Sequence, residues 1–151
     1  MRKVELEGLL NALVPHAERQ LAEYGDFYPF AGVMRTDGAL ESVAPDPEAV
    51  TSSLDQWQED LLEKLRAGAS AGFFRATGLV LNVEVDVPGS ERARAIRVAL
   101  EHETGVSYDV FIPYWFESGE LGMGSAMTAE GACEVFNFCV EPEAVPLAAG
   151  G

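Results

Sequence analysis

The sequence LVLNVEVDV at residues 79–87, with IRVALEHETGVSYDVFIPYW at residues 96–115, decides the fold. Both stretches alternate apolar and polar side chains, which is the period of two expected of strands with one buried face. The turn sequence Pro88-Gly89-Ser90-Glu91 separates the first two strands. Glu103-Thr104-Gly105 matches a three-residue hairpin loop with glycine in the left-handed position. We therefore predict three consecutive antiparallel strands.

The hairpin at Gly105 also predicts which residues face each other across the second and third of these strands. The expected pairs are His102 with Val106, Leu100 with Tyr108, Val98 with Val110 and Ile96 with Ile112. For the first and second strands, the preceding turn favours Leu81 opposite Val98 and Asn82 opposite Arg97.

Two amphipathic helices are predicted upstream of these strands. Residues 2–24 carry leucines at the three-to-four spacing of a helix, with Pro15 expected to kink or break it and Gly25 to end it. A second helix is expected to open at residues 45–48, where Asp46 can cap it, and to end at Gly68. Its apolar stripe would be Val50, Leu54, Trp57, Leu61 and Leu65.

The rest of the chain adds shorter elements. Residues 28–44 form a predicted hairpin around Asp37-Gly38. Residues 117–131, rich in Gly and Met, are expected to form a mobile loop, and residues 133–140 a last strand. The tail at residues 148–151 is expected to be disordered.

This order of elements predicts the fold class. We expect one α+β domain over residues 1–147, a two-layer sandwich with an antiparallel sheet of about five or six strands and two helices on one face. The order of helices and strands resembles the profilin-like, or roadblock-like, arrangement. That resemblance implies no particular function.

A second resemblance concerns residues. The sequence FYPFAGV at 27–33, Asp37-Gly38, ALEHETG at 99–105 and Ile112-Pro113-Tyr114 resemble short, acidic, functionally uncharacterised bacterial domains. Some of those domains are grouped with immunity proteins of toxin systems. The resemblance implies no catalytic residues.

Charge restricts the classes of partner. The 151 residues contain 10 Lys plus Arg and 25 Asp plus Glu, a net charge of −15. Nucleic-acid binding depends on Lys and Arg that neutralise phosphates, and anionic membranes attract basic segments, so neither partner is expected. A basic protein, a cationic ligand or a metal remains compatible with this charge, and acidity by itself also keeps a protein soluble.

The cysteines and the N-terminus favour the cytoplasm. If Cys133 and Cys139 share one strand, their Cα atoms lie about 20 Å apart. A disulfide needs less than about 7 Å, so we expect no pair, which fits a reducing compartment. The N-terminal sequence lacks the apolar core and cleavage site of a signal peptide, and no apolar run approaches the length of a membrane span.

One sheet face is a candidate binding surface. The predicted pairings place charged and large aromatic side chains together opposite the core: Glu84, Arg97, Glu101, Asp109, Phe111 and Trp115. Exposed aromatics rimmed by charge are typical of protein interfaces, whereas the same pattern also fits a solvated face with weak ion pairs.

A second candidate site is an aromatic pocket at the edge of the sheet. Its expected residues are Tyr28, Phe30, His102 and Tyr114, although the same side chains could simply plug the gap between helix and sheet. No catalytic or metal-binding signature accompanies it: no His-x-x-x-His, Cys-x-x-Cys or phosphate loop is present. Catalysis by Cys133 with His102 as base lacks a local signature as well.

These observations favour a non-enzymatic binding protein of immunity type, with no cofactor and no metal. It would use the acidic, aromatic face to bind a basic protein partner, because opposite charges steer association. The alternatives are a small-molecule binding module or enzyme that uses the aromatic pocket, and a structural homodimer.

Overall fold

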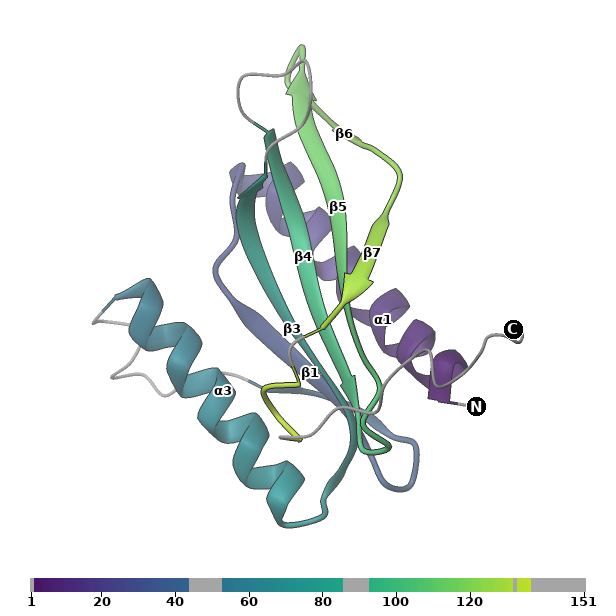
Figure 1. The fold of residues 1–151 in the computed structure, drawn as a ribbon. Helices are drawn as coiled ribbons and strands as arrows, with labels where there is room; N and C mark the ends of the chain where they lie inside the picture. The colour runs from purple at the N-terminus through teal and green to yellow at the C-terminus, as the bar shows by residue number, and fades with distance from the viewer. Residues whose placement is uncertain (1, 44–52, 86–92, 132, 137–151) are drawn as a thin grey trace.

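The computed structural model describes residues 2–43, 53–85, 93–131 and 133–136. Its centre is one antiparallel sheet with strand order β2-β1-β3-β4-β5-β6, and β7 also pairs with β5 (Figure 1). The strands are β1 (Phe30–Arg35), β2 (Leu40–Val43), β3 (Phe74–Val85), β4 (Ala93–His102), β5 (Ser107–Glu117), β6 (Glu120–Met123) and β7 (Met127–Glu130). The α+β class and an antiparallel sheet with helices packed on it are thereby confirmed.

Two helices complete the described part of the chain. α1 (Arg2–Tyr24) continues through Pro15 without the break that proline suggests, because leucines on both sides of Pro15 are buried against the sheet. Gly25, with φ +77°, ends α1 by donating its N–H to the Leu21 carbonyl. α3 (Leu54–Ser70) begins after Ser53, whose hydroxyl accepts a hydrogen bond from the Gln56 N–H. The expected helix opening at residues 45–48 lies outside the described residues.

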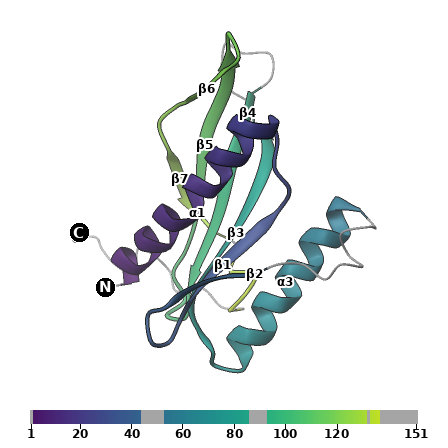
Figure 2. The ribbon, with the colours of Figure 1, turned by 180° about the vertical axis from the view of Figure 1, so that it is seen from behind.

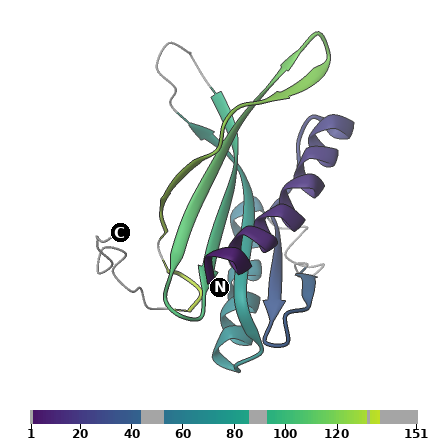
Figure 3. The same ribbon diagram turned by 90° about the vertical axis from the view of Figure 1, so that its right-hand side faces the viewer.

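The two helices lie on opposite faces of the sheet, which differs from the expected placement on one face. α1 packs on the side chains of Val80, Val98 and Ile112, whereas α3 packs on Leu79 and Leu81 of the other face. Figure 2 shows α1 in front of the sheet, and Figure 3 shows it along one side of the sheet seen nearly edge-on. The sheet is therefore the middle of three layers, because its central strands carry apolar side chains on both faces.

The strand register explains this difference. The predicted β4–β5 pairs, such as Val98 with Val110, are confirmed. Between β3 and β4, however, Val80 faces Val98 and Leu81 faces Arg97, one residue away from the prediction. A shift of one residue moves every side chain of a strand to the other face of the sheet.

A glycine pair lets α1 approach the sheet closely. Gly32 of β1 and Gly78 of β3 face each other across the strands. A Cβ atom at Gly32 would lie 2.7 Å from Leu13 Cδ2, and one at Gly78 would lie 2.6 Å from Leu13 Cδ1. The two methyl groups of Leu13 therefore occupy the space that these glycines leave open.

The stretch expected to be a mobile loop forms strands instead. Ser118 and Gly119 have φ values of 53° and 80°, the conformation of a two-residue hairpin turn between β5 and β6. β7 then pairs with the first half of β5. The described residues therefore contain seven strands, more than the five or six expected.

The described part of the expected last strand over residues 133–140 is not a strand. Residues 134–136 form a turn, and 137–140 lie outside the described residues, as does the tail at 148–151. Cys133 has φ +56° and is disulfide-bonded, so the prediction of an unpaired cysteine is wrong. The prediction assumed an extended strand between Cys133 and Cys139, the only other cysteine in the sequence.

Candidate functional site

The six side chains of the predicted binding face do not form one surface. Glu84 lies opposite Arg94 across β3 and β4, on the α1 face, because of the shift in the β3–β4 register. Arg97, on the opposite face, donates to Asp109 Oδ2 at 2.9 Å, so these two charges neutralise each other. Phe111 faces Arg97 across β4 and β5, and Trp115, which is 47% exposed, lies further along β5.

Glu101 is buried and makes a structural contact, although it was expected on the exposed binding face. It is 5% exposed, and its carboxylate accepts hydrogen bonds from three consecutive backbone N–H groups, those of Glu134, Val135 and Phe136, at 2.7–3.1 Å. Val135 packs with the leucines of α3. Glu101 thus holds the 134–136 turn against the sheet and is not available to a partner.

The predicted pocket residues also separate. His102 lies at the end of β4, where its Nε2 is 2.6 Å from Glu5 Oε1. Tyr114 lies near the other end of the sheet and donates its hydroxyl to Asn82 Oδ1 at 2.8 Å. Tyr28 and Phe30 line one pocket, and neither His102 nor Tyr114 is among the described residues that line it.

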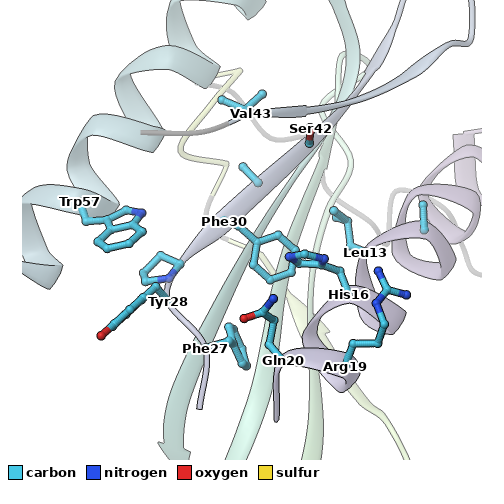
Figure 4. A pocket seen from close by; sticks show the side chains of 13 residues that line it. Leu13, His16, Arg19, Gln20, Phe27, Tyr28, Phe30, Ser42, Val43 and Trp57 are labelled. Carbon is cyan, nitrogen blue, oxygen red and sulfur yellow. The ribbon is translucent and has the colours of Figure 1, made fainter. Parts of the chain in front are cut away.

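That pocket is a hollow of about 520 Å³ between α1, the segment 27–31, β2 and the first turn of α3 (Figure 4). Its aromatic walls are Phe27, Tyr28, Phe30 and Trp57. The Tyr28 and Trp57 rings lie 4.8 Å apart between centroids, and the Phe27 and Phe30 rings lie 5.8 Å apart with their edges and faces in contact. Such walls suit a planar apolar group.

Polar side chains reach the hollow from one stretch of α1. His16, Arg19 and Gln20 line it, and the His16 ring meets Phe30 edge to face, with centroids 4.7 Å apart. Figure 4 shows Arg19 on one side of the hollow and Trp57 on the other, with Phe30 between them. The pocket therefore combines an aromatic side with a side that offers hydrogen-bond donors and a cation.

The cation of Arg19 differs from the other described guanidinium groups. Arg35, Arg66, Arg75 and Arg97 each form an ion pair with a side chain of the chain, and Arg94 donates to Asn82 Oδ1. Arg19 pairs with no side chain of the described residues, and Glu23, one turn further along α1, forms no ion pair with it there. Its charge is thus free for a ligand.

Sequence reasoning missed His16, Arg19 and Trp57. The available signal was the spacing of His16, Arg19 and Gln20 at i, i+3 and i+4, which places them on one face of a helix. Trp57 comes from the other helix, and only its placement beside Tyr28 makes it part of the wall.

A second polar cluster tethers the start of α1. His102 Nδ1 accepts from the Thr104 N–H at 3.2 Å, so the proton of the neutral ring lies on Nε2 and is donated to Glu5. Arg75 donates to the other carboxylate oxygen of Glu5 at 2.8 Å. The hydrogen bond from His102 and the Arg75 guanidinium hold the pKa of Glu5 below its ordinary value, although burial acts in the opposite direction.

The described residues form neither a metal site nor a membrane-spanning helix. They contain no group of three or more His, Cys, Asp or Glu side chains arranged to hold a metal ion. Neither described helix combines the length and the apolar character that crossing a membrane requires.

Comparison of the whole chain with models of protein families, with curated proteins and with solved structures finds no match.

Proposed function

We propose that this protein binds a small organic molecule in the hollow between α1 and α3. The observation that carries the proposal is the hollow of about 520 Å³ walled by four aromatic rings, a size and lining typical of small-molecule sites. The rings come from two separate parts of the chain, the segment 27–30 and α3, so the folded structure is needed to bring them together.

Fluorescence can test this proposal because the chain has two tryptophans, Trp57 and Trp115. A Trp115→Phe variant leaves Trp57, in the pocket wall, as the sole tryptophan reporter. We expect 4-phenylbutyrate, 4-phenylbutyramide or 4-phenylbutylamine to change its emission in a saturable way and to raise the melting temperature. If none of the three probes does so at millimolar concentration, the proposal is wrong.

A matched pair of α1 variants locates the binding. Ala12 lines the hollow and is exposed, so Ala12→Phe should fill its mouth and remove the response. Ala22 is exposed on the same helix and does not line the hollow, so Ala22→Phe should leave the response unchanged. Equal responses from both variants would place binding elsewhere.

A second candidate function is the immunity-type contact with a basic protein. Its support is an exposed apolar strip on the sheet face that α3 leaves open, where Trp115 is 47% and Met127 is 51% exposed and Met127 faces Phe111. The net charge of −15 complements a basic surface. Fewer residues support this contact than the sequence suggested, because Glu84 and Glu101 are not part of that strip.

The second candidate is tested with two β5 variants. Trp115→Ala should release a salt-sensitive basic partner, whereas Phe116→Ala, at a residue 45% exposed on the opposite face, should retain it. Light scattering over a range of protein concentrations distinguishes this contact from a homodimer. Retention of the partner by Trp115→Ala would contradict the contact.

The cellular location of the protein is also proposed. We propose a location in the cytoplasm of a bacterium on the basis of the composition of the chain. The argument from unpaired cysteines no longer supports this location, since Cys133 is disulfide-bonded.

A further inference from the structure

We infer that the ligand of the hollow is an organic anion, a carboxylate attached to a planar apolar body. This inference rests on the proposed function and specifies the chemical class of the ligand. The apolar body would lie between the aromatic walls near Tyr28 and Trp57, and the carboxylate would lie beside Arg19 (Figure 4).

The residues that line the hollow favour an anionic ligand. Asp and Glu make up 25 of the 151 residues, yet none of the 13 lining residues in the described part of the chain is acidic. The lining contains instead the Arg19 guanidinium, the His16 imidazole and the Gln20 amide. A site for a cation would place carboxylates in the lining, so this pattern favours an anion.

The unpaired guanidinium of Arg19 also favours an anion. Four other arginines form ion pairs within the chain and Arg94 donates to the Asn82 amide, whereas Arg19 has no partner among the described side chains. A guanidinium presents a planar set of donors that matches the two oxygens of a carboxylate. The net charge of −15 repels anions at long range, so the selectivity has to come from this local contact.

The positions of Arg19 and Trp57 indicate the shape of the ligand. Arg19 and Trp57 lie on opposite sides of one hollow, with Phe30 between them (Figure 4). A ligand that reaches both sides needs an apolar end and an anionic end. An arylalkanoic acid has this shape, whereas an inorganic anion would leave the aromatic walls unfilled.

The test compares three probes of one shape in the Trp115→Phe background. 4-Phenylbutyrate, 4-phenylbutyramide and 4-phenylbutylamine share a phenylalkyl body and end in an anionic carboxylate, a neutral amide and a cationic ammonium group, respectively. We expect the carboxylate to bind about fivefold to tenfold more tightly than the amide, and the amine to bind most weakly. Added salt should narrow this difference, because Arg19 is exposed and its charge is screened.

Arg19→Gln supplies the decisive control. It should reduce the affinity for the carboxylate to that for the amide and leave the affinity for the amide unchanged. Arg35→Gln, on β1 and paired with Glu41, should alter neither affinity. If the wild-type pocket binds all three probes equally, or if Arg19→Gln keeps the preference for the carboxylate, this inference is wrong while the proposed function stands. If no probe binds, the proposed function itself fails.

Discussion

Replacing Gly78 by alanine places a methyl group where Leu13 of α1 contacts the sheet. The new Cβ atom would lie 2.6 Å from Leu13 Cδ1 and 3.2 Å from Leu100 Cδ2. Leu13 cannot simply turn away, because its other methyl group occupies the matching space above Gly32. Overpacking of a filled core typically destabilises a protein by about 1–3 kcal/mol, and we expect about 2 kcal/mol here.

The partner variant, Leu13→Ala, creates a cavity instead. Leu13 is 7% exposed, and truncation of a buried leucine lowers the free energy of unfolding by about 2–5 kcal/mol. In that background the methyl group at position 78 meets no close atom of residue 13, and it fills part of the cavity. Gly78→Ala should then be neutral or stabilising by up to about 1 kcal/mol, because alanine also suits a strand better than glycine.

The double-mutant cycle therefore predicts a coupling free energy of about 2–3 kcal/mol. It is measured by urea unfolding of the wild type, the two single variants and the double variant, with equal m-values as the check on two-state behaviour. If Gly78→Ala changes the free energy of unfolding equally in both backgrounds, within about 0.5 kcal/mol, α1 does not pack on Gly78 and the placement of α1 is refuted.

Three further predictions concern stability. Glu101→Gln should lower the free energy of unfolding by about 2–3 kcal/mol and raise hydrogen exchange of the 134–136 amides, because a buried carboxylate that accepts three N–H groups is lost. The exposed Glu103→Gln is its control, and equal effects would contradict this role. Glu5→Gln should destabilise the protein by about 1–2 kcal/mol at pH 7 and by less at pH 3: because the pKa of Glu5 is lowered on folding, its contribution is present above the ordinary pKa and is lost as the pH falls through the folded-state pKa. An equal difference at both pH values, in unfolding curves of the two proteins, would exclude this linkage. Reduction of the Cys133 disulfide with dithiothreitol should lower stability by about 2–4 kcal/mol, as read from the melting temperature, and a Cys133→Ser variant should show no response to the reductant.

The hairpin at Gly105 shows what could be predicted locally. Gly105 has φ +92°, and the His102 N–H donates to the Val106 carbonyl as the loop sequence requires. The turn at Gly38, with φ +91°, was predictable for the same reason, since few residues other than glycine adopt this backbone conformation. The β4–β5 register follows directly from the Gly105 loop.

The β3–β4 register could not be predicted in this way. Residues 76–81 of β3 are all buried, because α1 covers one face of the strand and α3 the other. Alternation of apolar and polar side chains then no longer indicates which face is buried. The one-residue error in the predicted register placed Glu84 on the candidate binding face, whereas the observed register places it on the α1 face.

The candidate site was predictable only in part. Tyr28 and Phe30 were expected to line a pocket, and the structure places both in the hollow. His16 and Arg19 come from one helix and Trp57 from the other. Their meeting depends on where both helices pack relative to β1, which no short stretch of sequence specifies.

The sequence by itself therefore determined the elements whose signals are local: the leucine spacing of α1, the alternation along β4 and β5, and the glycine turns. These signals act over a few residues, through backbone conformation and the period of side-chain burial. Only the tertiary structure decided the faces on which the helices pack, the burial of Glu101, and the aromatic hollow with its unpaired Arg19. Those features depend on contacts between residues far apart in the chain, and packing selects such contacts only once the whole sheet has formed.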